Sequence, residues 1–260
     1  MKTPHFVLFA LLPLMKLSAE TVVLEQDFEN ETVGPYDSKA LHAGWSNVDW
    51  DHLFGRTRIV VDESESHRQV LEVLYPKGSV GPQEGGAQFL ISLEPGEEYS
   101  LRYDFKLSAD YDFRLGGKLP GLTSGGSLYT GGHKPDQGQG WSARYMWREH
   151  GNMVLYLYSI DMKGKWGDDH PFTMPPLERN RWYRVEQRIR INHPDEKDGS
   201  IEVWVDGEKV LDLTDIRLRK GDQGLIDSFY FSTFFGGNTP EWGPLNDCRS
   251  YFDNFRIWKD

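Results

Sequence analysis

Two neighbouring segments of the chain alternate between polar and apolar side chains and place groups with acid–base and anion-binding chemistry at every second position. Ser142 and Arg144 share one face of the first segment, residues 141–148, and Tyr156 and Tyr158 share one face of the second. An arginine binds anions through its planar fork, and a phenol gives or accepts a proton. The pattern indicates a site for a charged ligand, although a solvated outer face with two ordinary strand tyrosines fits it equally well.

The turn between the two segments decides which faces meet. It consists of three residues, Glu149–Gly151, and a three-residue loop with glycine in the left-handed conformation is a common way to close a hairpin. Counting back from this loop pairs Arg144 with Tyr156 and Ser142 with Tyr158, so that the four side chains point the same way. A two-residue turn would shift the register by one residue and scatter them.

The first 19 residues read as a targeting segment. Lys2 precedes an apolar run from Phe6 to Met15, and Leu17-Ser18-Ala19 provides a small-residue cleavage site before Glu20. This is the pattern of a secretory signal peptide, and the apolar run is too short to span a membrane. We therefore expect a secreted or periplasmic protein of a bacterial envelope, with a mature chain that begins near Glu20.

The rest of the chain is acidic and contains a single cysteine. Cys248 has no partner with which to form an internal disulfide, which suits an exported bacterial protein better than a small disulfide-stapled module. The net charge of −11 argues against nucleic acid or a membrane surface as a partner, but it is compatible with an acidic substrate in a locally cationic groove. Aromatic residues make up 13% of the sequence, which fits sugar binding as well as a large core.

Strand patterns fill most of residues 20–260, and no segment shows a convincing helical period. Loops are expected at 76–86 and 123–140, the latter a candidate lid, and irregular polar segments at 30–56 and 163–176. About a dozen strands without helices predict an all-β fold, a jelly-roll sandwich of two antiparallel sheets in a single domain. Outside the two segments above, the expected strands include 21–29, 57–61, 69–75, 87–93, 99–107, 182–191, 200–205, 210–213, 224–235 and 251–258.

Four motifs follow one another along the chain: Gly117–Leu122 with the sequence Gly-Lys-Leu-Pro-Gly-Leu, then Trp141–Arg148, Tyr156–Tyr158 and Phe231–Gly237. Together they resemble polysaccharide lyase family 14, over roughly residues 85–258. The resemblance implies a concanavalin-like β-jelly roll and an enzyme that cleaves alginate or glucuronan. It also implies a functional set that consists of Lys118, Ser142, Arg144, Tyr156 and Tyr158.

These residue types suit the β-elimination that the resemblance implies. Cleaving a 4-linked uronate requires neutralisation of its carboxylate, removal of the C5 proton and protonation of the O4 leaving group. Lys118 and Arg144 supply the positive charge. We expect Tyr156 or Tyr158 to take the C5 proton, because two nearby cations lower the pKa of a phenol from about 10. A tyrosine or Lys118 then assists O4, and Ser142 binds or orients the sugar.

Three further residues are candidates for substrate binding. Gln88 points to the face opposite Ala87, Arg148 lies on the face of Arg144, and His133 lies in the expected lid loop. No spacing of His, Asp or Glu indicates a zinc site, and we expect neither a catalytic metal nor another cofactor. The acidic loop residues 168–169 and 195–198 are compatible with a structural calcium ion.

Two other functions are compatible with the same fold. A lectin-like protein would bind an acidic polysaccharide without cleaving it, since a fold does not fix function. A jelly-roll glycoside hydrolase would need two carboxylates that face each other across a groove, and no strand motif of that kind is present. We expect a secreted lyase that acts on an acidic polysaccharide, alginate above glucuronan, as a monomer.

Overall fold

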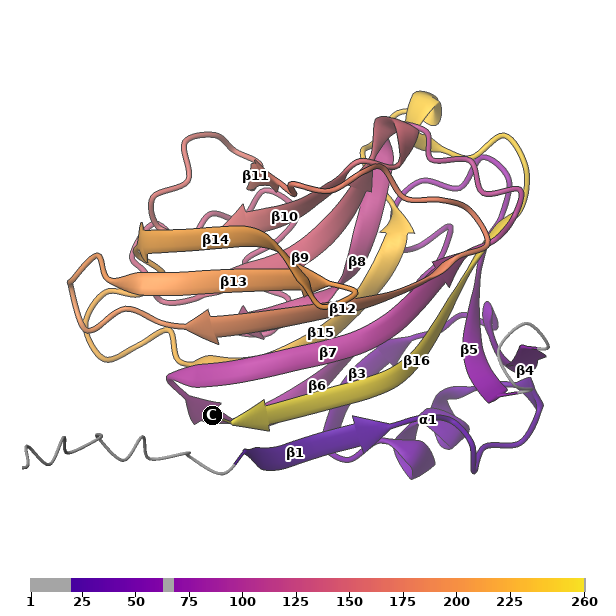
Figure 1. Ribbon diagram of the computed structural model, residues 1–260, viewed down its shortest axis with the longest axis horizontal. Coiled ribbons are helices and arrows are strands. Elements are labelled where there is room, and N and C mark those ends of the chain that lie inside the picture. The colour runs from indigo at the N-terminus through magenta and orange to yellow at the C-terminus, as the bar shows by residue number, and fades with distance from the viewer. Residues whose placement is uncertain (1–19, 63–67, 260) are drawn as a thin grey trace, which may run out of the picture.

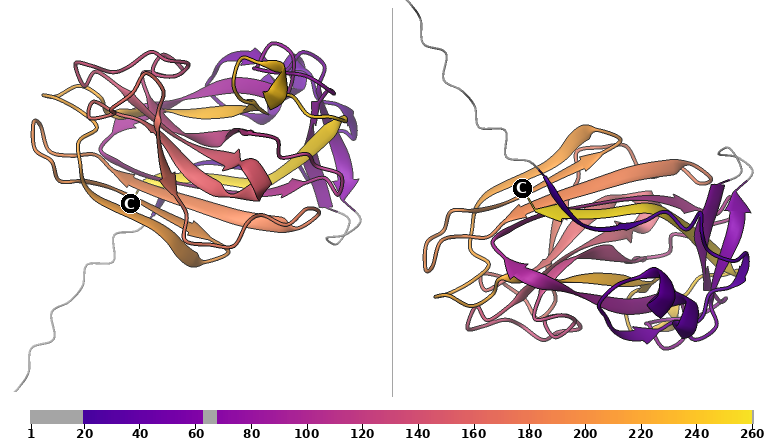
Figure 2. Two further views of the ribbon diagram at one scale, coloured as in Figure 1. Left: turned by 90° about the horizontal axis from the view of Figure 1, so that it is seen from above. Right: turned by 90° about the horizontal axis from the view of Figure 1, so that it is seen from below.

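The computed structural model describes residues 20–62 and 68–259, in which two antiparallel β-sheets pack face to face. Figure 2 shows the two layers of strands, and in Figure 1 the larger sheet lies nearer to the viewer. The two-sheet, all-β architecture predicted from the sequence is therefore confirmed. The predicted signal peptide, residues 1–19, lies outside the described residues. No helix in the described ranges is long and apolar enough to cross a membrane.

The smaller sheet has seven strands in the order β11-β10-β9-β8-β15-β6-β3. All of its neighbouring strands are antiparallel. Its strands are β3 (Val48–His52), β6 (Ala87–Gly96), β8 (Gly116–Ser124), β9 (Trp141–Arg148), β10 (Met153–Tyr158), β11 (Asp168–Pro171) and β15 (Ile226–Phe235).

The larger sheet has nine strands in the order β14-β13-β12-β7-β16-β5-β4-β2, and β1 pairs with the last part of β16. Its strands are β1 (Thr21–Gln26), β2 (Gly34–Pro35), β4 (Thr57–Asp62), β5 (Arg68–Tyr75), β7 (Glu98–Leu107), β12 (Trp182–Arg190), β13 (Gly199–Val205), β14 (Glu208–Ile216) and β16 (Cys248–Lys259).

The core between the sheets is built from the apolar side of each alternating strand. In β7, the side chains predicted to point inward, among them Tyr103 and Phe105, are fully buried. In β9 the core side carries Trp141, Tyr145 and Trp147, all fully buried. Aromatic rings of this size supply most of the buried apolar area, so most of the aromatic residues are core residues. The opposite side chains of β9 are thereby forced onto the outer face of the sheet.

The register of the β9–β10 hairpin agrees with the prediction. Arg144 is paired with Tyr156 and Ser142 with Tyr158. The connection is a short 3-10 turn, η1 (Glu149–Gly151), in which Gly151 has a φ of 86°. The three-residue loop is thus closed by a glycine in the left-handed region, as expected from its lack of a Cβ.

Two segments predicted to be irregular contain regular structure. Residues 30–56 include β2, β3 and a seven-residue helix, α1 (Ser38–Gly44), whose N-cap Asp37 accepts a hydrogen bond from the amide of Ala40. The helix buries a single side chain, Leu41, so no apolar period marks it in the sequence. Residues 163–176 include β11, a short edge strand of polar residues. The prediction of a helix-free, irregular segment was wrong because both elements are too short for periodicity to reveal.

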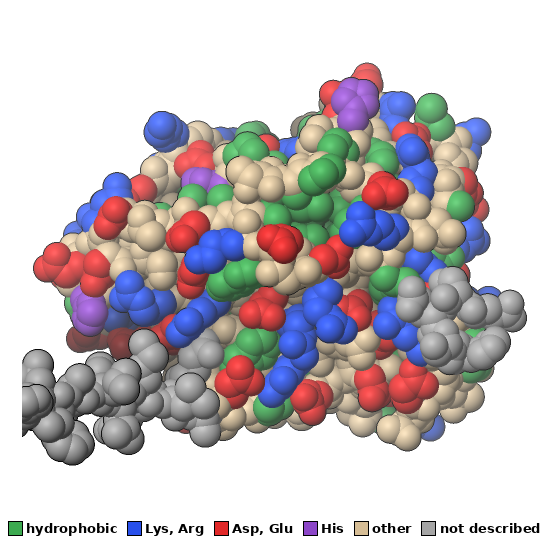
Figure 3. Space-filling view, in the orientation of Figure 1, with side chains coloured by type: hydrophobic (Ala, Val, Ile, Leu, Met, Phe, Trp, Pro, Cys, Tyr) green, Lys and Arg blue, Asp and Glu red, His purple; other side chains and the backbone are tan. Residues whose placement is uncertain are grey.

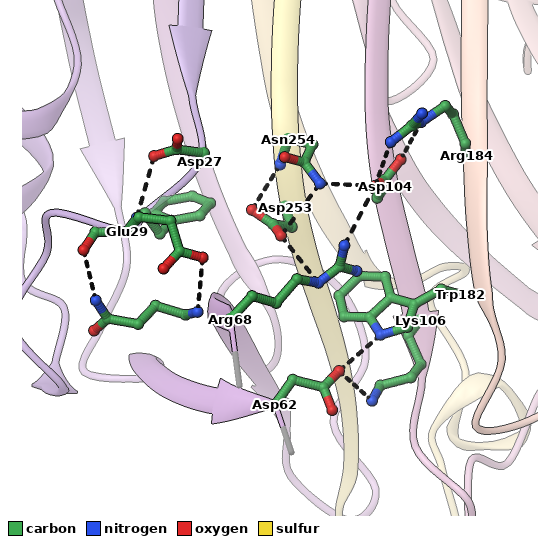
Figure 4. Close-up of polar contacts among 12 residues, drawn as sticks. Asp27, Glu29, Asp62, Arg68, Asp104, Lys106, Trp182, Arg184, Asp253 and Asn254 are labelled. Carbon is green, nitrogen blue, oxygen red and sulfur yellow. Dashed lines mark hydrogen bonds and ion pairs between the residues drawn. The ribbon is translucent and has the colours of Figure 1, made fainter. Parts of the chain in front are cut away.

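The outer face of the nine-stranded sheet carries paired charges of both signs (Figure 3). Asp104 accepts two hydrogen bonds from Arg184, at 2.8 and 3.0 Å, and Arg68 lies between Asp104 and Asp253 (Figure 4). Lys106 donates to Asp62 at 2.6 Å. Because acids and bases are matched there, this face has no evident surplus of positive charge for an acidic polymer.

Candidate active site

A groove with a volume of about 1110 Å³ lies on the outer face of the seven-stranded sheet. Its floor consists of side chains from the strands, and three loops line its sides, at residues 81–83, 127–133 and 236–242. The second of these belongs to the segment predicted as a candidate lid. All four predicted catalytic residues line this groove; they are Lys118, Arg144, Tyr156 and Tyr158.

A single row of directly paired residues runs across the floor, perpendicular to the strands. Directly paired residues point to the same side of a sheet, and adjacent strands lie about 4.8 Å apart, so the row spans about 29 Å over seven strands. The row brings together side chains that are distant in sequence. From β3 to β11 it consists of Trp50, Leu90, Tyr230, Gly121, Arg144, Tyr156 and Asp169.

A β-bulge in β8 places Lys118 beside this row. The register shifts between Leu119 and Gly121, so Pro120 is the extra residue. Proline has no N–H to donate to the ladder and is tolerated at such a bulge. Leu119 and Leu122 then both face the core, while Lys118 and Gly121 face the groove side. Gly121 is required by close approach, because a Cβ there would lie 2.1 Å from the carbonyl oxygen of Ala143.

Lys118 is buried in the groove without an acidic partner. Its side chain is only 9% exposed, its Nζ lies 2.8 Å from the Sδ of Met146, and the same Nζ lies 4.0 Å from the centre of the Tyr156 ring. Burial, and then the positive charges of Arg144 and Arg148, hold the pKa of Lys118 well below its usual value. The lowered pKa eases loss of a proton from this side chain, which makes the Lys118 amine a candidate proton acceptor.

Arg144 is a second buried cation. It is 2% exposed, its Nη1 donates to the Ser232 Oγ at 3.1 Å, and its guanidinium carbon lies 5.2 Å from the centre of the Tyr230 ring. Its Nε has no hydrogen-bond partner. A buried guanidinium with an unsatisfied donor is costly unless a ligand completes its hydrogen bonds. Because Arg144 also lines the groove, its guanidinium is a candidate for binding an anion there.

The charges that line the groove are unbalanced. Lys118, Arg144 and Arg148 contribute three cationic groups, and Asp169 is the acidic residue in the groove lining, paired with Arg148 at 2.5 Å. Within the described ranges, Lys118 and Arg144 have no carboxylate within 4 Å. In a chain of net charge −11, this local excess of positive charge indicates an anionic ligand.

The two tyrosines differ in their surroundings. Burial, together with the neighbouring Tyr158, raises the pKa of Tyr156, and Arg144 and Arg148 offset only part of that rise. The expectation that the cations give Tyr156 a lowered pKa is therefore wrong, because removal of the phenol from water outweighs their field. The Tyr158 hydroxyl accepts a hydrogen bond from the amide of Gly132 at 3.1 Å, which ties it to the loop above.

A family model, Polysaccharide lyase 14, matches residues 63–255, which is most of the chain. The chain belongs to polysaccharide lyase family 14. This membership confirms the sequence-based recognition and the prediction that the protein is a polysaccharide lyase. No match was found among curated protein sequences.

Solved structures of similar lyases share the fold of this family 14 lyase. Alginate lyase Aly36B is 28% identical with a TM-score of 0.79, over 90% of this chain and 95% of that one. The marine family 14 alginate lyase from Aplysia kurodai is 25% identical with a TM-score of 0.78, over 92% and 100%. The endo-β-1,4-glucuronan lyase from Trichoderma reesei, at 12% identity and a TM-score of 0.58 over 92% and 96%, shows the shared fold. The predicted jelly roll is thereby confirmed.

The structure of the family 14 lyase gathers most of the residues predicted to bind substrate. Gln88 lies on the groove floor and donates to the Tyr230 hydroxyl and to Ser232, while Arg148 and His133 line the groove from β9 and from the loop. Ser142 is the exception. Its hydroxyl is fully buried, does not line the groove, and donates to the carbonyl of Tyr129 at 2.8 Å. It anchors the loop and does not reach the groove.

Sequence reasoning missed several groove residues of the lyase. Tyr230 lines the groove and Ser232 lies beneath it, bonded to Arg144 and Gln88, and their alternation with the core residues Phe229 and Phe231 would have identified them. Trp50 left no such signal, because a register shift between Val48 and Trp50 interrupts the alternation of β3. The other missed aromatic residues of the lining are His52, Trp166, Phe234 and Trp242.

Within residues 20–62 and 68–259, no group of three or more His, Cys, Asp or Glu side chains is arranged to hold a metal ion.

The hydrogen bond between the loop and Tyr158 gives a prediction for Gly132→Ala. Gly132 has a φ of +92°, and an added Cβ would lie 3.0 Å from Lys165 and 3.2 Å from Trp166. The strain should displace the amide that orients Tyr158 and lower kcat severalfold in a lyase assay. Gly131→Ala is the matched control, because Gly131 also has a positive φ, +59°, but open space for a Cβ. Equal activity of the two variants would contradict the role of the Gly132 amide.

Proposed function

We propose that this lyase cleaves a 4-linked polyuronate by β-elimination, with alginate as the favoured substrate and glucuronan as the second candidate. The observation that carries the proposal is the pair of buried basic side chains without acidic partners, Lys118 and Arg144, beside protonatable phenols. Alginate is favoured because the similar lyases at 25–28% identity are alginate lyases, and Aly36B mutants have been solved with alginate tri- and tetrasaccharides. The glucuronan lyase shares the fold alone.

Arg144 neutralises the substrate carboxylate in this mechanism. Its planar fork matches a carboxylate, and the side chain lines the groove without a carboxylate of the protein beside it. Removing the C5 proton moves negative charge onto that carboxylate, so a fixed cation there stabilises the transition state more than the ground state. The low exposure of Arg144 strengthens this interaction, because little water screens it.

Lys118 is the proton acceptor that the electrostatics favour. Its lowered pKa leaves the amine able to accept a proton, whereas the raised pKa of Tyr156 keeps that phenol protonated. This assignment differs from the expectation that a tyrosine takes the proton. The physical reason is that burial acts in opposite directions on a cationic acid and on a neutral one.

Tyr156 then serves as the proton donor to O4. As Lys118 takes the C5 proton, the C5–H electrons form the C4–C5 double bond, the C4–O4 bond breaks, and O4 receives the Tyr156 proton. Exchange with water in the open groove then returns a proton to the Tyr156 phenolate and removes one from the Lys118 ammonium. The reaction restores both groups and needs no oxidant or reductant.

The proposal is tested by incubating the protein with alginate and, separately, with glucuronan, while the ultraviolet absorbance of the new C4–C5 double bond is followed. Elimination produces this absorbance together with new reducing ends. A hydrolase would produce reducing ends without it, and a lectin would produce neither. If neither polymer gave the absorbance, the proposed substrate class would be wrong.

The pH profile of kcat/KM should identify Lys118 as the base. This parameter reports ionisations of the free enzyme. Because a base acts in its unprotonated form and the pKa of Lys118 is lowered, activity should rise with pH and level off well below the ordinary lysine value of about 10.4. The raised pKa of Tyr156 should keep the donor protonated over that plateau. A profile that still climbed near pH 10 would contradict a pre-lowered lysine.

We also propose that the lyase is exported, with residues 1–19 as its signal peptide, and that it acts as a monomer. An extracellular or periplasmic location would bring it to a polymer too large to enter a cell. N-terminal sequencing of the protein recovered outside the cytoplasm would locate the cleavage site.

A further inference from the structure

The edge of the seven-stranded sheet carries a row of aromatic rings that continues from the active site. From Tyr230, beside Arg144, the ring of Trp50 lies 5.8 Å away, that of His52 lies 5.1 Å beyond it, and that of Phe54 lies 5.3 Å further. We call Trp50, His52 and Phe54 the edge track. The track thus leads outward from the buried cations to the rim of the sheet.

The register shift in β3 creates this surface. Val48 pairs with Ile91 of β6, but Trp50 pairs with Leu90, so the bulge turns Trp50 and His52 to the outer face. Asp51 pairs with Phe89, a core residue, and its carboxylate accepts a hydrogen bond from Ser38 instead. At Trp50 and His52 the outer side of β3 therefore presents rings.

Phe54 is an unusual residue for its position. It has a φ of +52° in the turn that ends with the hydrogen bond from the Arg56 amide to the Leu53 carbonyl, and Gly55 follows with a φ of +69°. Asparagine or glycine is the ordinary choice for such a conformation, and a bulky side chain there is strained. The ring is nevertheless 50% exposed and is not part of the core. A strained backbone that displays an apolar ring to solvent points to a function for that ring.

The wall beside the track is fixed in place. Arg56 lies 4.7 Å from the centre of the Phe54 ring and donates to the carbonyls of Pro82, Gln83 and Gly86. Pro82 and Gln83 also line the catalytic groove. Arg56 thereby connects the track and the groove wall into one continuous surface. A long ligand that extends out of the groove on this side would contact that surface.

We propose that the edge track is a distal binding site for the polyuronate chain, beyond the sugars that occupy the catalytic centre. The inference rests on the proposed function. A polymer that crosses the strands along the paired row reaches Trp50 on β3, the last strand of the sheet on that side, and we infer that it then turns along β3 over His52 and Phe54. The apolar faces of its sugar rings pack on the aromatic surface, and their carboxylates remain in water at the rim.

The experiment compares Phe54→Ala, at the track residue that does not line the catalytic groove, with the parent enzyme on alginate oligosaccharides of increasing length. For chains long enough to reach the track, we expect kcat/KM to fall about tenfold because KM rises while kcat stays the same. For the shortest cleavable oligosaccharide we expect the variant and the parent enzyme to have nearly the same kcat/KM. Trp204→Ala is the matched control, because Trp204 lies on the outer face of β13 in the other sheet and contacts Lys209. Equal losses at all lengths, or none, would overturn the inference.

A second variant separates binding from folding. Phe54→Gly relieves the positive φ, so it should leave the melting temperature unchanged or raise it, while it weakens binding of long chains. Binding is measured by calorimetry in the Lys118→Ala background, in which the substrate is not consumed. If long chains bind Lys118→Ala with the same affinity whether or not Phe54 is replaced, the track is not a binding site. If the parent enzyme degrades neither polyuronate, the proposed function fails first, and the inference fails with it.

Discussion

Replacing Lys118 with alanine should lower kcat/KM on alginate by about 10²- to 10⁴-fold, the range that a positioned general base contributes. The amine is buried beside Arg144 and Arg148, so its pKa is lowered and it is available as a proton acceptor. Its removal should leave the fold intact, since its one hydrogen bond is to the sulfur of Met146. Initial rates from the double-bond absorbance, with a thermal melt of each variant, provide the measurement.

The variant Lys118→Arg distinguishes a base from a mere positive charge. Arginine keeps the charge but cannot lose a proton in a protein. If Lys118 accepts the C5 proton, Lys118→Arg should be about as inactive as Lys118→Ala. Activity close to that of the parent enzyme would show that Lys118 contributes only its charge. The general base would then be one of the two tyrosines.

Replacing Arg144 with methionine should have opposite effects on activity and stability. Loss of the carboxylate-binding fork should lower kcat/KM by about 10²- to 10³-fold or more, as for other groups that stabilise developing negative charge. The same change removes a buried cation that has no acidic partner and fills its place with an apolar side chain. Such replacements are often neutral or stabilising, so the melting temperature should stay constant or rise by about 2–4 °C, which corresponds to about 1 kcal/mol at this size.

Arg184→Met is the contrasting control for this prediction. Arg184 makes two hydrogen bonds to Asp104 on the opposite sheet, far from the groove lining. Its loss leaves a buried carboxylate with fewer partners, so the melting temperature should fall while turnover is retained. A marked loss of stability in Arg144→Met, with turnover retained, would mean that Arg144 is a structural residue.

The hairpin shows why part of the site was predictable from sequence. Strand alternation and a three-residue turn ending in glycine fix both the face and the register, so the pairs of Arg144 with Tyr156 and Ser142 with Tyr158 followed from local rules. Those rules predict the side of the sheet to which a side chain points, but not how deeply that side chain is buried. Ser142 points to the predicted side, yet the loop that contains Tyr129 covers it, and a loop path is set by contacts between distant segments.

The pKa values of the site could not be predicted from proximity alone. The sequence indicated that cations lie near Tyr156, but not how completely the phenol is removed from water. That removal decides whether the pKa of Tyr156 is raised or lowered. Trp50 was missed for a different reason. Its side of the sheet is set by a bulge against β6, a strand about forty residues later, and no periodicity within β3 records it.

The contrast between an acidic molecule and its cationic groove has a consequence for salt dependence. The chain carries a net charge of −11, so a polyanion approaching from a distance is repelled before it meets the groove. Mobile ions screen interactions beyond about 8 Å at physiological ionic strength but act weakly on buried charges such as Lys118 and Arg144. Moderate salt should therefore speed the encounter between enzyme and polymer while leaving binding inside the groove largely unchanged.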